Sequence, residues 1–204
     1  SFSKTAKSTI TGEIKLNEIH LWEVGCGRLY DLELTFGEDK VKSYFGIRTT
    51  AFDNQYYLLN GKPLYLRTVL DQGFYKKGIY TAETEEELVR DIYLSLDAGF
   101  NGARLHQKVF EQRFLYHCDR LGYIVWGEYA NWGTDHTEPY SLAQFAPQWL
   151  EEIDRDYSHP AIVGWCPFNE TWDMKGRQQY DDVLKNIYLI TKAADNTRPC
   201  IDTS

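Results

Sequence analysis

The chain has 204 residues, of which 43% are hydrophobic and 25% charged, a balance typical of a soluble globular protein with one or two domains. Its formal net charge of −8 argues against nucleic acid or an anionic membrane as a partner, and no stretch approaches the roughly 18 apolar residues of a membrane span. Aromatic residues make up 15% of the chain, which is compatible with carbohydrate binding but is explained equally well by a large core.

Residues 1–50 have the pattern of an all-β segment. Apolar and polar residues alternate over 13–16, 29–36 and 40–45, and glycines between these stretches supply turns. This gives three or four strands, whereas a complete sandwich needs about seven. The segment therefore resembles the end of a larger β domain.

Residues 51–63 predict a small hairpin at the entry to the next region. Asn60-Gly61 is a strong signal for a type I′ turn, because both positions of that turn require positive φ. The turn separates the apolar stretches 56–59 and 64–66, which are the two expected hairpin strands.

From Pro63 onward the pattern changes to alternating strands and helices. The expected strands are 64–70, 100–105, 123–126, 161–168 and one that begins at Cys200. The expected helices are 85–98, opened by a capping box of Thr84 and Glu87, 111–121, closed by Gly122, 141–157 and about 177–195. Such alternation predicts parallel strands joined by right-handed crossovers. Because a (β/α)8 barrel takes about 250 residues, only its first half fits here.

The four cysteines, Cys26, Cys118, Cys166 and Cys200, are widely spaced and form no CxxC motif. We expect buried free thiols rather than a disulfide framework or a zinc site. The acidic run at 83–87 opens a helix, where its charge favours the helix dipole, so it is not interpreted as a calcium site. No metal and no cofactor is predicted.

The clearest chemical signal follows the apolar run 162–165, which predicts a buried parallel strand. This strand delivers Asn169 and Glu170 to its C-terminal end, where barrel enzymes place their active sites. A carboxylate beside an amide suits protonation of a leaving oxygen next to a sugar ring. We expect Trp165 and Trp172 to surround the carboxylate. Such apolar walls would raise its pKa toward neutrality, as an acid that donates a proton requires.

Five motifs carry a family resemblance: FGIR (45–48), NGKPLYLR (60–67), DAGFNGARLH (97–106), CDRLGYIVWGE (118–128) and RDYSHPAIVGWCPFNE (155–170). On these motifs the chain, from about Leu21 to Ser204, resembles glycoside hydrolase family 2, which includes β-galactosidases and β-glucuronidases. The resemblance implies a sugar-binding jelly roll, absent here, then an immunoglobulin-like sandwich and a catalytic TIM barrel. Residues 1–50 would be the C-terminal part of the sandwich, and residues 51–204 the first half of the barrel.

The same resemblance implies a retaining β-glycosidase, of the β-galactosidase type, that hydrolyses O-glycosyl bonds. Glu170 matches the family's general acid/base, and Asn169 matches the asparagine that contacts the sugar 2-hydroxyl. The family's nucleophilic glutamate comes from the seventh barrel strand, so we expect it beyond Ser204. With half of the carboxylate pair and an open barrel edge, residues 1–204 alone are predicted to be inactive.

Three further residues are candidates for the cleft. The resemblance implies that Arg104 supports the nucleophile; its alternative is a structural ion pair. His106 either faces the substrate, as a histidine near this position does in the family, or is satisfied by the fold. Glu128 ends the third strand, where the family's glutamate helps to bind Mg²⁺ in some β-galactosidases. A lone carboxylate is a poor magnesium site, so we expect Glu128 in the cleft without a metal.

Asp71 stands where many family members carry a sugar-contacting histidine, and it either touches substrate or caps the following loop. Trp126, Trp132 and Trp172 are candidate platforms for sugar stacking, although core packing would explain each of them equally well. His159-Pro160 is expected to end a helix rather than to take part in chemistry.

Two other functions stay open. One is a non-catalytic carbohydrate-binding relative that kept the scaffold. The other is a barrel glycosidase of the same clan, such as a cellulase-like enzyme, although the FGIR and NGKP motifs count against it because such enzymes need no sandwich before the barrel. The expected partners are a carbohydrate substrate and the remainder of the parent chain, with no nucleic acid and no membrane. The β-glycoside cleaved, the compartment and a homo-oligomeric state are left open.

Overall fold

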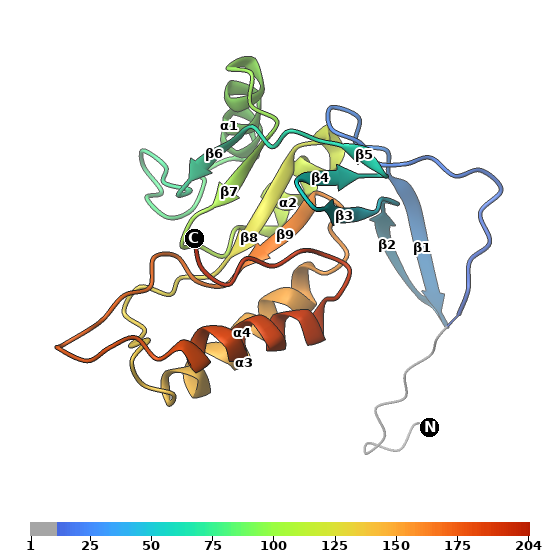
Figure 1. Ribbon diagram of the computed structural model, residues 1–204. Helices are drawn as coiled ribbons and strands as arrows, with labels where there is room; N and C mark the ends of the chain where they lie inside the picture. Colours follow the sequence, from blue (N-terminus) through green and yellow to red (C-terminus); the bar gives the residue numbers. More distant parts are fainter. Residues whose placement is uncertain (1–11) are drawn as a thin grey trace.

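The computed structural model describes residues 12–204, so residues 1–11 of the predicted domain 1–50 lie outside the described part (Figure 1). The described chain forms a two-stranded antiparallel sheet, a three-stranded antiparallel sheet and a four-stranded parallel sheet. The parallel sheet, with its helices, carries all of the predicted site residues at or near its strand ends.

The first sheet is a hairpin of β1 (Tyr30–Phe36) and β2 (Asp39–Phe45), which confirms the strands expected at 29–36 and 40–45. Gly37 at φ +62° supplies the turn. The strand expected at 13–16 is wrong. Ile14 is exposed there and the segment belongs to no described strand, so its alternating side chains have no sheet face to bury.

Side chains from the hairpin and the residues after it attach this part to the start of the parallel sheet. Arg48 Nε donates to the carbonyl oxygen of Pro160 (2.9 Å). Tyr44 Oη donates to the buried carboxylate of Asp119 (2.8 Å), and His159 Nδ1 lies 2.6 Å from the same oxygen. His159-Pro160 follows the end of a helix at Asp156, as expected, and in addition joins two parts of the fold at the end of the sheet opposite the candidate site.

The second sheet contains β3 (Thr50–Asp53), β4 (Tyr56–Leu59) and β5 (Lys62–Pro63). Asn60 and Gly61 have φ angles of +52° and +74°, as the predicted type I′ turn requires. The second hairpin strand is 62–63 rather than 64–66, because a two-residue turn pairs Leu59 directly with Lys62. In Figure 1 this sheet lies beside the beginnings of β8 and β9.

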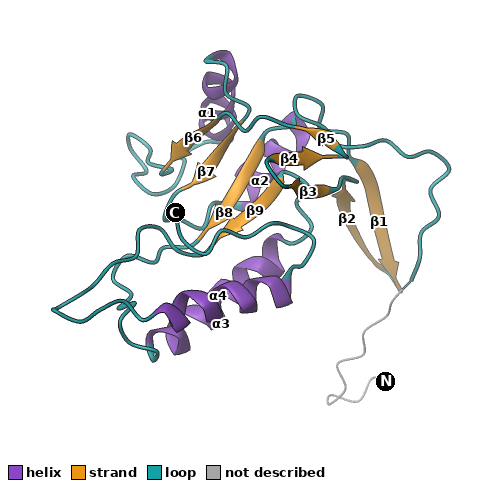
Figure 2. Cartoon of the chain, in the orientation of Figure 1, coloured by secondary structure: helices purple, strands orange, loops and turns teal. Residues whose placement is uncertain are grey.

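The third sheet has four parallel strands in chain order: β6 (Thr68–Asp71), β7 (Gly102–Leu105), β8 (Ile124–Glu128) and β9 (Ile162–Cys166). The helices that follow them are α1 (Glu85–Asp97), α2 (Gln112–Leu121), α3 (Ser141–Asp156) and α4 (Asp181–Ala194). Figure 2 shows α3 and α4 side by side along the sheet. The predicted α/β alternation with parallel strands is confirmed.

Several elements differ in detail from expectation. β6 begins at Thr68 rather than at residue 64, and α4 begins at Asp181 rather than at about 177. The capping box at α1 is wrong, because the Thr84 side chain makes no cap bond and the Glu87 carboxylate accepts instead from the Glu83 N–H (2.8 Å). The segment from Cys200 makes two isolated parallel bridges, from Cys200 to Trp165 of β9 and from Thr203 to Phe168 just after it, so it runs beside β9 without forming a regular strand.

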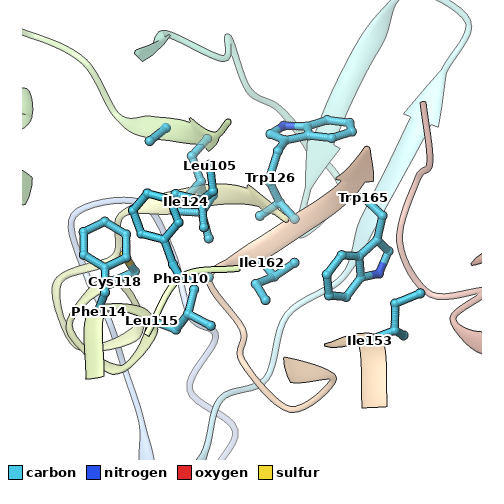
Figure 3. Close-up of a cluster of buried hydrophobic side chains, with 14 of the residues drawn as sticks. Leu105, Phe110, Phe114, Leu115, Cys118, Ile124, Trp126, Ile153, Ile162 and Trp165 are labelled. Carbon is cyan, nitrogen blue, oxygen red and sulfur yellow. The ribbon is translucent and has the colours of Figure 1, made fainter. Parts of the chain in front are cut away.

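The core lies between the sheet and its helices. Figure 3 shows Ile162, Trp165 and Ile153 on one side of the strands and Trp126 projecting from the other. Trp165 is completely buried and donates its Nε1–H to Asp195 Oδ2 (2.8 Å). All four cysteines are free; Cys118 and Cys166 are buried as expected, whereas Cys26 and Cys200 are only partly buried.

Candidate active site

The predicted site residues gather where the four parallel strands end. Asp71 and Glu128 are the last residues of β6 and β8, and His106 follows β7 directly. Asn169 and Glu170 follow β9 after a short irregular segment. Because parallel strands end at one edge, residues far apart in the sequence come together here.

A buried ion pair forms the floor of the site. Arg104 Nε donates to Glu128 Oε2 at 2.6 Å, and Arg104 Nη2 lies 3.3 Å from Glu128 Oε1. The Glu128 carboxylate is fully buried. Burial by itself would lower the pKa of the Arg104 guanidinium, but the hydrogen bond and charge of Glu128 outweigh it and the pKa is raised. The Arg104 guanidinium is therefore charged, and its two hydrogen bonds to Glu128 fix its direction.

Asn169 is buried beside this pair, and only part of its amide is used. Its Oδ1 accepts a hydrogen bond from Arg104 Nη2, and Ser204 Oγ lies 3.4 Å from the same oxygen. The Asn169 Nδ2 donor is buried and has no hydrogen-bond partner within residues 12–204. A buried donor without a partner costs free energy, which is the pattern expected of a group that waits for a ligand oxygen.

Glu170 stands at the rim of the site with an unusual backbone. Its φ of +49° lies in the left-handed region, and its main-chain N–H donates to the Ser204 carbonyl oxygen (2.9 Å). The side chain is exposed. A non-glycine residue in this conformation is held there by its surroundings, and such residues cluster at functional sites.

The expected apolar surround of Glu170 is corrected by the structure. Trp165 does not surround Glu170. Its side chain points to the face of the sheet that the helices cover, where it is completely buried, and not toward the strand end that carries Glu170. Trp172 lies after the strand and is 49% exposed, and its ring centroid is 6.2 Å from that of Trp132, which is 58% exposed. Of the three candidate stacking platforms, Trp132 and Trp172 are accessible, whereas Trp126 is buried.

A cavity of about 300 Å³ opens next to this tryptophan pair. It is lined by Gln72, Phe74, Tyr80, His106, Gln107, Ala130 and Trp132. The His106 ring meets Trp132 edge to face, with centroids 6.1 Å apart, and Gln72 Nε2 lies 3.4 Å from His106 Nδ1. His106 thus faces the cavity, at the strand edge that carries the other candidates.

Asp71 is placed differently from the other candidates. Its Oδ1 accepts the Gly73 N–H (2.8 Å), which is the loop-capping contact considered as its alternative role. Burial raises the pKa of the Asp71 carboxyl, opposed by the Gly73 N–H and by the charge of Lys108. Of the seven predicted site residues only His106 lines the cavity, so what distinguishes Asp71 is this contact within its own loop.

Two residues of the site carried no clear sequence signal. Gln107 has a φ of +56°, its N–H donates to Glu128 Oε1 (3.0 Å), and its Oε1 accepts the Asn131 N–H (2.8 Å). Asn131 in turn bonds both main-chain polar atoms of Asn169. Together with the hydrogen bonds from Arg104 to Glu128 and to Asn169, these bonds form a closed circuit that joins the ends of β7, β8 and β9. The only hint was that Gln107 follows the Arg-Leu-His triplet; Asn131 is a lone asparagine in a loop.

Other features of the described chain do not join this site. A larger cavity of about 760 Å³, next to α3, is lined by none of the seven predicted site residues. No cluster of three or more potential metal ligands occurs within residues 12–204. In the same part of the chain, no helix combines the length and apolar character needed to cross a membrane.

The sequence of this chain is similar to those of known proteins over most of its length. Residues 50–202 match the family described as Glycosyl hydrolases family 2, TIM barrel domain. The chain is 30% identical to a β-glucuronidase of Rattus norvegicus over 205 residues, covering 92% of this chain and 31% of the relative. It is 27% identical to a β-galactosidase of Leuconostoc mesenteroides over 208 residues, covering 96% of this chain and 19% of the relative.

The fold of this chain is also similar to that of a solved β-glucuronidase structure. A β-glucuronidase from an uncultured Clostridium species matches with a TM-score of 0.79 at 26% identity, covering 89% of this chain and 32% of that chain. This chain spans about a third of the length of these two β-glucuronidases, and less of the β-galactosidase.

Proposed function

The chain belongs to glycosyl hydrolase family 2, and on that premise we propose that its parent protein is a retaining β-glycosidase with Glu170 as general acid/base. The observation that carries the proposal is the position of Asn169-Glu170 at the end of β9, beside the buried Arg104–Glu128 pair. The family premise supports a carbohydrate substrate, and the strand-end geometry supports these residues as its contacts.

In the proposed mechanism, Glu170 donates its proton to the glycosidic oxygen as the bond to the anomeric carbon breaks. A second carboxylate, expected outside residues 1–204, attacks that carbon and forms a covalent glycosyl-enzyme intermediate. Glu170, now a carboxylate, then takes a proton from the water that hydrolyses the intermediate. Retaining enzymes hold the two carboxyl groups about 5–5.5 Å apart.

The neighbouring residues have supporting roles in this proposal. Arg104 donates to the side-chain oxygen Oδ1 of Asn169 and leaves the Nδ2 donor for a sugar hydroxyl. His106 and Trp132, which face the cavity, and Trp172 would contact the sugar or its leaving group. Glu128 holds the Arg104 charge and needs no metal for that role.

The domain assignment is part of the same proposal. We propose residues 1–50 as the C-terminal part of an immunoglobulin-like sandwich and residues 51–204 as the first half of the catalytic barrel. The β1–β2 hairpin, attached to the start of the parallel sheet, supports this division. Residues 1–204 without the rest of the parent would give no turnover, since they hold one member of the carboxylate pair.

The sugar is tested first with the parent protein on nitrophenyl β-glycosides. We propose a β-galactoside as the substrate. A β-glucuronide is the alternative, because β-glucuronidases and β-galactosidases both match this chain. Glu170→Gln is expected to lower the rate on poor leaving groups by about 10²–10⁴-fold. Glu86→Gln, which changes an exposed carboxylate on α1, serves as the matched control. An unchanged rate in Glu170→Gln removes it from the acid role.

A further inference from the structure

We propose that Asn131 is a positioning residue for the Glu170 carboxylate. Its buried side-chain amide fixes the main chain of Asn169, and through it the peptide that carries Glu170. This inference rests on the proposed function, because it assigns a role toward the acid/base group. It adds a residue from the β8–α3 loop that touches neither sugar nor leaving group.

The contact between the two asparagines has two points. Asn131 Oδ1 accepts the Asn169 N–H at 2.8 Å, and Asn131 Nδ2 donates to the Asn169 carbonyl oxygen at 3.1 Å. Asn131 is fully buried. The Asn169 N–H and C=O belong to the two peptide planes that flank its Cα, so both planes are fixed.

The second of these planes also contains the nitrogen of Glu170. That nitrogen donates to the Ser204 carbonyl oxygen at 2.9 Å, so the Asn169–Glu170 peptide is held at its oxygen by Asn131 and at its nitrogen by Ser204. Glu170 has a φ of +49°, a conformation that a non-glycine residue keeps only where its neighbours impose it. Loss of one restraint would let the peptide rotate and the carboxyl group move.

Asn131 is itself fixed in one orientation. Its N–H donates to Gln107 Oε1 at 2.8 Å, and its Nδ2 lies 3.2 Å from His136 Nε2. A flipped amide would turn a donor toward the Asn169 N–H and an acceptor toward the Asn169 carbonyl oxygen. The side chain is therefore a rigid link between the β7, β8 and β9 ends.

The role predicts a kinetic pattern that a general loss of stability does not produce. A leaving group such as dinitrophenolate departs without protonation, whereas phenolate needs the proton of Glu170. If Asn131 positions that carboxyl, its loss lowers kcat/KM, which reports the bond-breaking first step, only for the leaving group that needs the proton; hydrolysis of the intermediate, which also uses Glu170, does not enter kcat/KM. A displacement of about 1 Å in a catalytic group can cost about 100-fold in rate.

The test uses the intact parent enzyme with dinitrophenyl and phenyl β-glycosides of the sugar selected by the nitrophenyl screen. We expect Asn131→Ala to lower kcat/KM about 100-fold on the phenyl glycoside and less than about 3-fold on the dinitrophenyl glycoside. Thr134→Ala, in the same loop, is the matched control and should leave both rates unchanged. If Asn131→Ala does not fold, Asn131→Asp replaces it, since that variant keeps the acceptor and removes the donor, and the same split is expected.

Glu170→Gln, measured on the same two substrates, distinguishes the acid role of Glu170 from the positioning role of Asn131. A leaving-group-dependent loss in Glu170→Gln, together with an equal loss on both substrates or no loss in the Asn131 variant, overturns the positioning role alone. A Glu170→Gln variant that slows both substrates equally overturns the acid role, and the role of Asn131 with it. If both variants lose much more kcat/KM on the phenyl glycoside than on the dinitrophenyl glycoside, the acid role of Glu170 and the positioning role of Asn131 are both supported.

Discussion

Replacement of Lys108 by Met should loosen the loop that forms one wall of the cavity. The Lys108 ammonium is buried and donates to the carbonyl oxygens of Gly73 and Tyr80, both at 2.7 Å. It also lies 4.6–5.4 Å from the ring centroids of Tyr75, Tyr80 and Phe110. Burial lowers the pKa of Lys108, opposed by the nearby charges of Glu111 and Asp71. Residues 73–80 therefore fold around a single internal cation.

The magnitude follows from the two charged hydrogen bonds. Each is worth about 1.5–3 kcal/mol, and methionine keeps the stem volume but leaves both carbonyl oxygens without this donor. Removal of a buried charge returns part of the loss, because its desolvation is no longer paid. We expect a net cost of about 2 kcal/mol for closing the loop, which is about a 30-fold increase in the open fraction.

Amide hydrogen exchange of the parent protein measures this opening directly. Tyr75 and Ile79 donate to each other's carbonyl oxygens across the loop (2.9 and 3.0 Å), so their amides report its closure. Their protection should fall about 30-fold in Lys108→Met and stay unchanged in the control Lys76→Met. Because Phe74 and Tyr80 line the cavity, KM for a nitrophenyl glycoside should rise more than kcat falls. Unchanged exchange rates at the Tyr75 and Ile79 amides would refute the role of Lys108 in holding the loop closed.

Two further predictions concern stability. Burial by itself would raise the pKa of Asp195, but the charge of Arg198 and hydrogen bonds from Thr197, Trp165 and Arg198 lower it to about 2. This carboxylate therefore stabilises the fold above its ordinary pKa near 4, and about 2 kcal/mol should be lost as pH falls from 5 to 2; Asp195→Asn should remove that pH dependence in unfolding titrations. Gly122→Ala should destabilise the fold by more than about 1 kcal/mol in thermal unfolding, because φ is +70° and a Cβ would stand 2.5 Å from main-chain atoms of Cys26 and Glu23. Gly176→Ala, at φ +73° with open space around it, carries the backbone strain alone and should cost less.

Much of the fold was accessible from the sequence because its signals are local. The type I′ turn at Asn60-Gly61 and the helix end at Gly122 depend on backbone angles that few residues adopt, so they were predicted correctly. The alternation of strands and helices follows from hydrophobic period and predicted the parallel sheet. The errors arose where local pattern was insufficient: residues 13–16 alternate but have no sheet face to cover, and Thr84 has the right residue type for a cap without the contact.

The site divides in the same way. The sequence by itself determined that Asn169 and Glu170 follow a buried strand, and the family motifs directed attention to Arg104 and Glu128. Only the tertiary structure decided that Trp165 turns into the core and that Asn131 holds the main chain of Asn169. Such contacts join residues 38 positions apart, and hydrogen bonds to main-chain atoms leave no residue-type signature on the partner. Their partners become visible only when parallel strands bring the loops to one edge.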